Sequence, residues 1–305
     1  MSAAKTRNIA ASVRQRLLNL AHGSNEPFDL VLVRYALERL LYRLSVSEFS
    51  DRFVLKGALL FTLWGHADHR PTRDADLLGF GPDEPAHLQA VFRQLSAMAF
   101  EDGITYDPET VAAEAIAEDK VYAGIRVTLQ AGLDGARIPV QFDIGFGDVV
   151  TPAAERAEFT TLLDFPPPVL RIYPVYTVIA EKFHSMVVLG AENSRMKDFY
   201  DLWAIAGRFE LEGAILRRAL AATFERRATP VPVETPFALT PGFASDKAKL
   251  AQWSGFIRKS RLRTGKLSLS EMQNSISALV MPAVFSLNEG KAFDVLWQPG
   301  GPWKK

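Results

Sequence analysis

The sequence predicts an α+β fold in which a mixed-sheet domain is followed by a mostly helical C-terminal domain. Three observations predict it. Strand and helix patterns alternate over the first part of the chain, a triple proline at 166–168 ends that part, and helical periodicity dominates afterwards. This order of elements is typical of α+β proteins or of separate domains. We therefore expect a sheet-containing domain with N-terminal helices at 1–165 and a helical domain at 166–305.

The N-terminal part begins with two expected helices. Apolar residues recur at helical spacing in 8–21 and in 27–45. The charged residues of the second helix lie off its apolar stripe, so we expect them to form a solvated face. They are Arg34, Glu38, Arg39 and Arg43.

The remaining elements follow from the spacing of apolar residues and turn residues. Up to the triple proline, the expected segments are 52–65 (a short strand that enters a helix at Lys56-Gly57), 74–80 (strand), 86–101 (helix), and 121–131 and 137–147 (strands). The last two alternate apolar and polar residues around the turn Leu133-Asp134-Gly135, which predicts a hairpin or meander. The later helices are expected at 175–189, 195–209, 211–226, 245–260 and 268–280.

The composition limits the classes of function. Lys plus Arg and Asp plus Glu both number 35, so the net charge is zero, which excludes a bulk polycation but permits a local basic face. The absence of cysteine excludes disulfides, Cys-ligated zinc and thiol catalysis. The N-terminal segment lacks a signal-peptide core, and the apolar runs are too short to cross a bilayer. We expect a soluble, cytoplasmic protein with no membrane partner.

Two aspartates on the expected strand 74–80 indicate a metal site. Side chains two residues apart on a strand point to the same face, so Asp74 and Asp76 present two carboxylates together. Such a pair suits Mg²⁺ (or Mn²⁺), which takes a few protein oxygens and completes its shell with water and substrate phosphates. The alternative is two exposed acids on a sheet edge. The apolar residues that follow favour a buried strand, in which unpaired carboxylates are costly.

A third carboxylate lies on the expected strand 137–147. There Asp143 shares one face with Gln141 and Gly145, opposite the apolar face. If this strand neighbours 74–80, Asp143 completes a three-carboxylate site for two metal ions. The alternative is an acid in a salt bridge.

These motifs together resemble the polymerase-β nucleotidyltransferase superfamily. The shared order is a helix-entering glycine (Gly57), an acidic pair on a strand (Asp74 and Asp76) and a lone acid on a later strand (Asp143). In that superfamily a small residue, often serine, follows the glycine; Ala58 stands there in this chain and brings no hydroxyl. The resemblance implies a polymerase-β-like nucleotidyltransferase core with a mixed sheet.

A fuller resemblance, over about 53–203, is to the AbiEii/AbiGii-type toxins of bacterial abortive-infection and toxin–antitoxin systems. Five segments carry it in the family's order: FVLKGALLFTLW, RPTRDADLLG, VQFDIGFGD, TVIAEKFHSMV and SRMKDFYDLW. It implies a Mg²⁺-dependent enzyme of phage defence that transfers a nucleotide from an NTP and is restrained by an antitoxin protein.

The resemblance also implies roles for individual residues. Lys182 and Asp198 match the family's catalytic lysine and aspartate, and Asp201 is expected to orient Lys182 or to cap local structure. A lysine there can neutralise charge on the leaving pyrophosphate, although a surface lysine is the alternative. The hydroxyl of Thr72 can contact phosphate, cap the turn, or be a phosphorylation target that silences the toxin. The expected nucleotide-binding residues are Lys56, Gly57, Arg70, Thr72, Lys182 and Asp201. For Lys56 and Arg70, the alternative is a surface cation without a ligand.

A basic segment at 247–266 suggests an RNA-binding face. It holds seven Lys or Arg residues and no acid, with Trp253 and Phe256 among them. Cations can bind phosphates and aromatic rings can stack on bases, although a solvated helix packed by its aromatic residues is the alternative. The residues expected to bind RNA are Arg258, Lys259, Arg261 and Arg263.

These expectations combine into one favoured function. It is nucleotidyl transfer from an NTP to the 3′ end of tRNA, which would block translation. Asp74, Asp76 and Asp143 are the expected metal ligands, with Asp143 alternatively a general base. The rival functions are nucleotidylation of a small molecule or a protein, and NTP binding by a non-catalytic regulator. A P-loop enzyme is excluded because no G-x-x-x-x-G-K-[ST] motif occurs.

Overall fold

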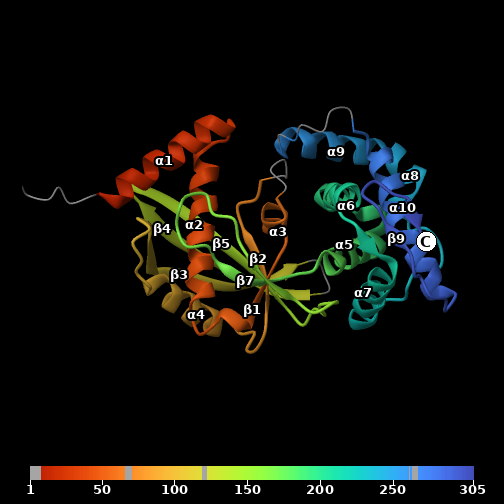
Figure 1. Ribbon diagram of the computed structural model, residues 1–305, viewed down its shortest axis with the longest axis horizontal. Coiled ribbons are helices and arrows are strands. Elements are labelled where there is room, and N and C mark those ends of the chain that lie inside the picture. Colours follow the sequence, from red (N-terminus) through yellow and green to blue (C-terminus); the bar gives the residue numbers. More distant parts are fainter. Residues whose placement is uncertain (1–7, 66–70, 119–121, 261, 263–266) are drawn as a thin grey trace, which may run out of the picture. The chain divides into compact units, whose positions relative to one another are not determined.

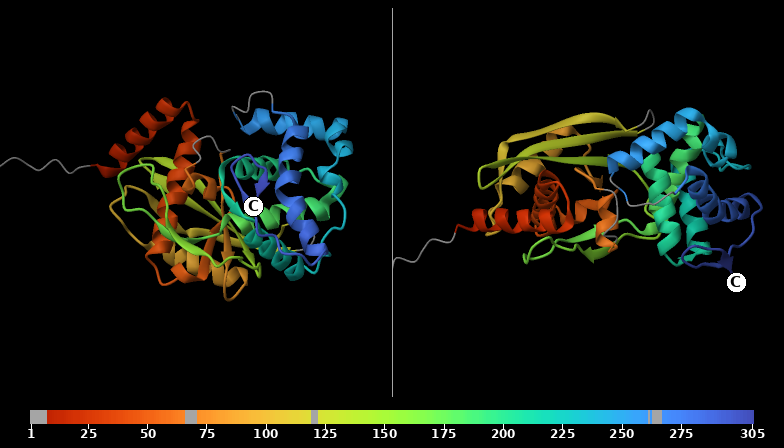
Figure 2. Two further views of the ribbon diagram at one scale, coloured as in Figure 1. Left: turned by 45° about the vertical axis from the view of Figure 1, so that its right-hand side comes forward. Right: turned by 90° about the horizontal axis from the view of Figure 1, so that it is seen from above.

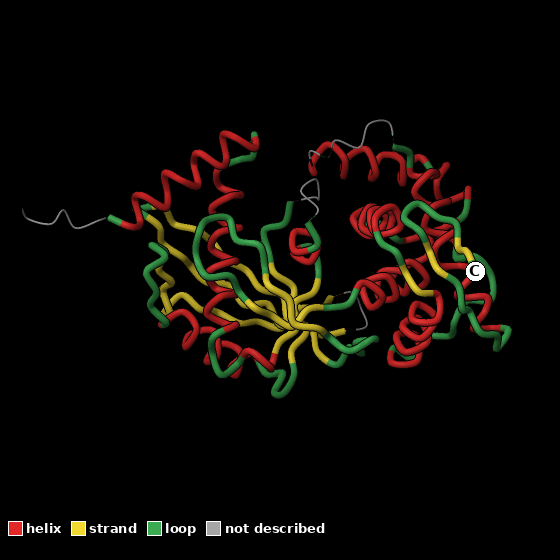
Figure 3. Tube along the Cα trace, in the orientation of Figure 1, coloured by secondary structure: helices red, strands yellow, loops and turns green. Residues whose placement is uncertain are grey.

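The computed structural model divides the chain into two compact units (Figures 1 and 3). Unit 1 comprises Met1–Gly147 and Glu155–Ile172, and unit 2 comprises Asp148–Ala154 and Tyr173–Lys305. The structure describes residues 8–65, 71–118, 122–260, 262 and 267–305.

Unit 1 is built on a seven-stranded mixed sheet with the strand order β3-β4-β5-β2-β1-β7-β6. The strands are β1 (Phe53–Lys56), β2 (Ala75–Gly79), β3 (Thr105–Glu118), β4 (Tyr122–Leu133), β5 (Ala136–Phe146), β6 (Glu155–Glu158) and β7 (Val169–Ile172). β2 is parallel to β5 and β1 is parallel to β7, whereas the other neighbours are antiparallel. The predicted α+β fold with a mixed sheet is confirmed.

Helices cover the apolar face of this sheet (Figures 1 and 2). The helices of unit 1 are α1 (Ile9–Ser24), α2 (Phe28–Ser45), α3 (Leu59–Leu63) and α4 (Pro85–Ala97). α2 and α4 pack on β5 and β3, where the ring of Phe92 in α4 lies 5.1 Å from that of Phe142 in β5. Apolar residues alternate with polar ones along β4 and β5, so the opposite face of the sheet carries the polar residues.

The expected solvated face of α2 is wrong. Glu38, Arg39 and Arg43 are at most 2% exposed. Both arginines bind the buried carboxylate of Asp102, at 3.2 Å from Arg39 Nε and 2.8 Å from Arg43 Nη1. Glu38 accepts a hydrogen bond from the backbone N–H of Leu162 at 2.7 Å. Chain segments outside α2 therefore enclose its charged side, which helical periodicity alone does not reveal.

The edge strand β3 has no counterpart among the expected elements. Its second half, VAAEAIAE at 111–118, consists largely of residues that favour helix. Its first half contains Pro108, and the pairing with β4 shifts between Asp107 and Ala112, as at a β-bulge. Pairing with a long neighbouring strand thus overrides the local preference.

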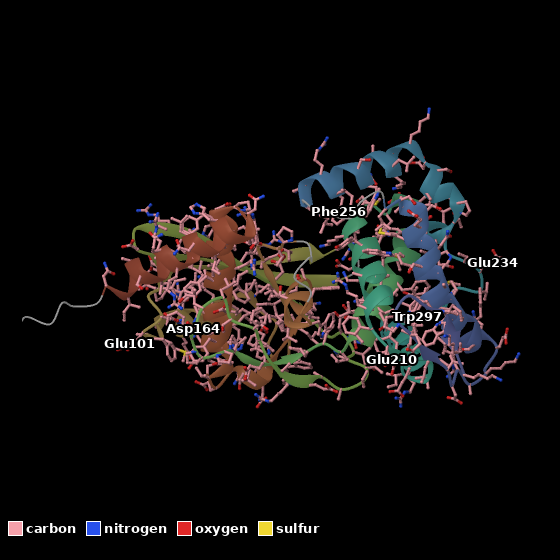
Figure 4. The ribbon with its side chains drawn as sticks, turned by 45° about the horizontal axis from the view of Figure 1, so that its top comes forward. Glu101, Asp164, Glu210, Glu234, Phe256 and Trp297 are labelled. Atoms are coloured by element: carbon pink, nitrogen blue, oxygen red, sulfur yellow. The ribbon has the colours of Figure 1, made fainter. Side chains whose placement is uncertain are left out.

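Unit 2 is mostly helical, as the sequence predicts for the C-terminal part. Its helices of five or more residues are α5 (Val175–Leu189), α6 (Met196–Arg208), α7 (Gly213–Arg226), α8 (Pro241–Ser245), α9 (Lys247–Ser260) and α10 (Leu269–Asn288). A small antiparallel sheet of β8 (Leu211–Glu212), β9 (Leu296–Trp297) and β10 (Trp303–Lys304) was not expected. Trp297, labelled in Figure 4, is buried and donates its indole N–H to the carbonyl of Ala206. Within the described residues, no helix has the length and apolar character needed to cross a membrane.

Candidate active site

Strand register places five charged residues in one row across the sheet of unit 1. The row runs in the order Glu114 (β3), Arg126 (β4), Asp143 (β5), Asp76 (β2) and Lys56 (β1), and is called the charged row below. Residues directly opposite each other on neighbouring strands point to the same face. Two central carboxylates therefore lie side by side, with a cation on each flank.

Gly57 makes the space in which the Asp76 carboxylate lies. Its φ is +75°, and a Cβ built there would lie 1.8 Å from Oδ2 of Asp76. A side chain at this position would strain the backbone and displace the carboxylate. A second glycine, Gly145, has a similar relation to Lys56, whose Nζ lies 3.0 Å from the place of the missing Cβ. Glycines thus let both charged groups lie close to the sheet.

Arg126 holds both oxygens of Asp143. Its Nε donates to Oδ1 at 2.8 Å and its Nη2 donates to Oδ2 at 2.7 Å, a two-bond geometry that fixes the carboxylate. The amide of Gln141 donates to Oδ1 at 3.1 Å. The hydrogen bond to Asp143 is the main cause that raises the pKa of Arg126, and the charges of Asp74 and Glu114 act in the same direction.

Asp74 and Asp76 lie on either side of Ala75, whose side chain is fully buried. The two acids therefore leave the start of β2 on the face opposite that alanine. The hydroxyl of Thr72 donates a hydrogen bond to Oδ1 of Asp74, so Thr72 contacts the acid pair directly. Arg70 lies outside the described residues.

The acid pair, Asp74 and Asp76, offers donor atoms of the type that a divalent cation binds. Asp74 and Asp76 offer carboxylate oxygens, which Mg²⁺ prefers, and Gly57 leaves the space that the carboxylate of Asp76 occupies. Arg126, however, engages both oxygens of Asp143. Within the described ranges, no group of three or more His, Cys, Asp or Glu side chains is arranged to hold a metal ion. The pair therefore fits a cation that keeps water and phosphate oxygens in its shell, and Asp143 could join only if Arg126 released it.

A second charged cluster lies inside unit 2, between α5 and α6. Lys182 Nζ donates to Asp198 Oδ1 at 2.7 Å and to Asp201 Oδ2 at 2.8 Å. Arg195 Nε donates to Asp198 Oδ2 at 2.6 Å. Burial acts to raise the pKa of Asp198, but the charges of Lys182 and Arg195 hold it below its usual range. These four residues are called the Lys182 cluster; the structure brings together the lysine and both aspartates that the sequence singles out.

His184, two residues after Lys182 in α5, belongs to a different network. Its Nδ1 accepts from Arg227 at 3.2 Å, and its Nε2 therefore carries the proton and donates to Thr229 Oγ1 at 2.9 Å. Burial and the charge of Arg227 lower the pKa of His184 to about 4, against the effect of Asp148. A neutral, fully paired histidine has a structural role here.

The basic helix α9 presents only some of its charges outward. Arg258 and Lys259 are exposed in its last turn, whereas Lys249 is buried and donates to the carbonyl of Asn193. The indole of Trp253 is also buried and packs on Phe256, which Figure 4 labels. The idea that Trp253 stacks on bases is therefore wrong, since its ring packs within unit 2. Arg261 and Arg263 lie outside the described residues.

Sequence reasoning missed Arg126, although a signal for it exists. Asp134 and Gly135 form a two-residue turn in which both φ angles are positive, 46° and 79°. Such a turn fixes the register of the hairpin. Counting back from the pair Leu133 and Ala136 places residue 126 opposite Asp143.

Comparisons with known proteins identify first the class and then the family. The chain matches a family of nucleotidyl transferases. The match, to the family described as "Nucleotidyl transferase AbiEii toxin, Type IV TA system", covers residues 39–271, well over half of the chain. The protein therefore belongs to the AbiEii toxin family, as the sequence motifs predict.

Two crystal structures from Helicobacter pylori resemble the chain. One is of a candidate nucleotidyltransferase, with 12% identity and a TM-score of 0.47, and the match covers 86% of this chain and 97% of that one. The other is of JHP933, with 13% identity and a TM-score of 0.49, and the match covers 86% of this chain and 94% of that one. No curated protein matches the chain.

Proposed function

We propose that the protein transfers a nucleotide from an NTP to the 3′ end of tRNA in a reaction that needs Mg²⁺ or Mn²⁺, and that this modification blocks translation. Membership of the AbiEii family supports nucleotidyl transfer as the reaction class. The observation that carries the proposal is the register of β2 and β5, which pairs Asp76 with Asp143, with Asp74 immediately before β2. Paired carboxylates beside a phosphate-binding cation are what in-line phosphoryl chemistry requires.

The aspartates of unit 1 are assigned to the reacting centre. Asp74 and Asp76 are the proposed cation ligands, and a bound cation supplies charge neutralisation and alignment of the α-phosphate. Asp143 has two candidate roles, as a third ligand or as the base that takes the proton from the attacking hydroxyl. The acceptor oxygen bonds to the α-phosphorus as the bond from that phosphorus to the β-phosphate oxygen breaks, and pyrophosphate leaves. Positioning and charge provide most of the catalysis.

The remaining residues are assigned to binding. Lys182 is proposed to bind the triphosphate, and Asp198 to orient that lysine or the acceptor. Exposed cations at the end of α9 are proposed to bind the RNA backbone. They are Arg258 and Lys259, followed in the chain by Arg261 and Arg263. The other proposed nucleotide-binding residues are Lys56, Gly57, Arg70, Thr72 and Asp201.

One partner and one point of control follow from the same proposal. A toxin of a type IV toxin–antitoxin system implies an antitoxin protein that counters its effect. The hydroxyl of Thr72 is a candidate point of control, because its hydrogen bond to Asp74 places it beside the acid pair. A phosphate on that oxygen would set negative charge next to the carboxylates and oppose cation binding.

The test is a transfer assay with purified protein, Mg²⁺, total tRNA and each labelled NTP in turn, with Asp74→Ala as the inactive control. We expect label on tRNA with the wild type and none with the variant. Label on a protein or on a small molecule, in place of tRNA, would show that this other molecule is the acceptor. NTP binding without any pyrophosphate release would indicate a non-catalytic regulator and overturn the proposal.

A further inference from the structure

Asp198 divides its carboxylate between two cations. Oδ1 accepts from Lys182 Nζ at 2.7 Å and Oδ2 accepts from Arg195 Nε at 2.6 Å. Asp198 is itself fully buried, so while both donors are in place neither oxygen is solvated by bulk water. Each oxygen therefore depends on its own protein partner, because an unpaired buried oxygen costs stability.

The charges of the Lys182 cluster balance only when Arg195 is counted. Lys182 and Arg195 carry two positive charges, and Asp198 and Asp201 carry two negative charges, so the sum is zero. Without Arg195 the other three residues sum to one negative charge (1 − 2). A net negative cluster would repel a polyphosphate and hold the ammonium of Lys182 on its own carboxylates.

Arg195 is also held in place independently of Asp198. Its backbone N–H donates to Asn193 Oδ1 at 2.9 Å. The backbone carbonyl of Asn193 in turn accepts from the buried ammonium of Lys249 in α9, at 2.9 Å. That ammonium lies 5.1 Å from the ring centroid of Phe243, so its place is fixed on two sides. The segment that leads into α6 is thus anchored before it reaches the carboxylates.

We propose that Arg195 is a positioning residue that sets the charge and orientation of Lys182 through Asp198. Arg195 binds one oxygen of Asp198 and neutralises part of its charge. The positive charge of Lys182 therefore remains available to bind the triphosphate of the NTP. The inference rests on the proposed role of Lys182 in NTP binding. Because the side chain of Arg195 is 33% exposed, a small cation from solution can reach its place when it is removed.

The experiment compares binding of a fluorescent NTP analogue and steady-state transfer in a set of variants. They are the full-length wild type, Lys182→Met, Arg195→Ala, Arg195→Lys and Arg208→Ala. Arg208 is the matched control, since it is an exposed arginine at the end of the same helix. We expect Arg195→Ala to raise the Kd and KM for NTP by about 10- to 100-fold, because this is the usual effect of losing a hydrogen bond to a charged group. The change in kcat should be smaller. Arg195→Lys should lie near the wild type.

Chemical rescue separates positioning from a merely structural role. Millimolar guanidinium should restore NTP affinity to Arg195→Ala, and equal concentrations of urea or KCl should not. The inference is overturned if guanidinium does not restore affinity, or if Arg195→Ala binds NTP as Arg208→Ala does. If Lys182→Met binds NTP like the wild type, the proposed role of Lys182 is wrong and the inference with it. If Lys182→Met loses affinity and Arg195→Ala keeps it, only the inference is wrong.

Discussion

The charged row of unit 1 and the Lys182 cluster of unit 2 both set aspartates beside cations, but they do so in different environments. In the row, strand register fixes the spacing, and Arg126, which holds Asp143, is 35% exposed. In the cluster, Asp198 and Asp201 are fully buried and depend on two helices for their partners. Solvent therefore replaces a lost partner more readily in the row than at the fully buried aspartates of the cluster. Substitutions in the row should mainly affect activity, and those in the cluster should also affect folding.

The largest expected effect is that of Asp198→Ala. The change leaves Arg195 and Lys182 without the carboxylate that they share, and breaking a buried ion pair costs about 3–5 kcal/mol. The free energy of unfolding in urea measures this loss. Asp74→Ala, which changes the acid next to Asp76 of the row, is the matched comparison. We expect it to abolish transfer and to leave the urea midpoint unchanged. Equal midpoints for the two variants would break the distinction between the row and the cluster.

Glu38 tests whether burial alone, without a proposed chemical role, makes a charge costly. Burial raises its pKa to about 7, against the lowering effects of the Leu162 N–H and of Arg39. The folded state thus binds this proton more tightly than the unfolded chain, whose glutamate has its usual pKa near 4.5. The contribution of Glu38 to stability is therefore full below that value and is lost as the pH rises through about 7. The difference between the two pKa values corresponds to about 3 kcal/mol.

The measurement is the free energy of unfolding of the wild type and of Glu38→Gln between pH 5 and 8 (about the range in which the group titrates). The stability of the wild type relative to the variant should fall as the pH rises. Other titrating groups are common to both proteins and cancel in the difference. A difference that is flat or rises with pH would show that the burial of Glu38 does not govern its protonation.

The sequence predicts the charged row better than it predicts the buried networks, for a physical reason. Alternation and a two-residue turn at Asp134-Gly135 define the β4–β5 hairpin locally, and that register puts Arg126 opposite Asp143. The burial of Arg39 depends instead on Asp102, which is far away in the chain. Contacts of this kind follow from tertiary packing, and helical periodicity carries no record of them.

The Lys182 cluster shows the same limit. The spacing of Asp198 and Asp201 places them on one helix face, so their approach to a common lysine is predictable. The charge balance supplied by Arg195 is not, because it depends on how the chain enters α6 from Asn193. Family motifs identify which residues matter, and the structure is needed to see which neighbours hold them.

Two glycines with the same backbone strain make a sharper test of the row. Gly57 and Gly65 have φ values of +75° and +76°. A Cβ at Gly57 would meet Asp76, whereas among the residues that the structure describes a Cβ at Gly65 would meet nothing within 4 Å. Alanine in the left-handed region costs about 1–2 kcal/mol at either position. Displacement of the Asp76 carboxylate should lower transfer by Gly57→Ala about 100-fold, as misplacement of a catalytic group by about 1 Å does. Transfer of labelled nucleotide measures the activity of each variant, and urea unfolding measures its stability. Equal activity of the two variants would show that Asp76 is not part of the active site.

The smallest expected effect on stability is that of Arg126→Lys, which decides the role of Asp143. Lysine keeps the charge but cannot hold both carboxylate oxygens, and because Arg126 is partly exposed the cost is at most about 1 kcal/mol. Arg137→Lys, at an exposed position of the same hairpin, is the control. If Asp143 is a cation ligand, weakening its bond to residue 126 frees an oxygen, and Mn²⁺ binding measured by electron paramagnetic resonance becomes tighter than in the control. We expect this outcome, since Arg126 and a cation compete for the same two oxygens. Unchanged Mn²⁺ affinity with a lower kcat would instead assign Asp143 as the base, because a misaligned base slows proton transfer without altering the site that holds the cation.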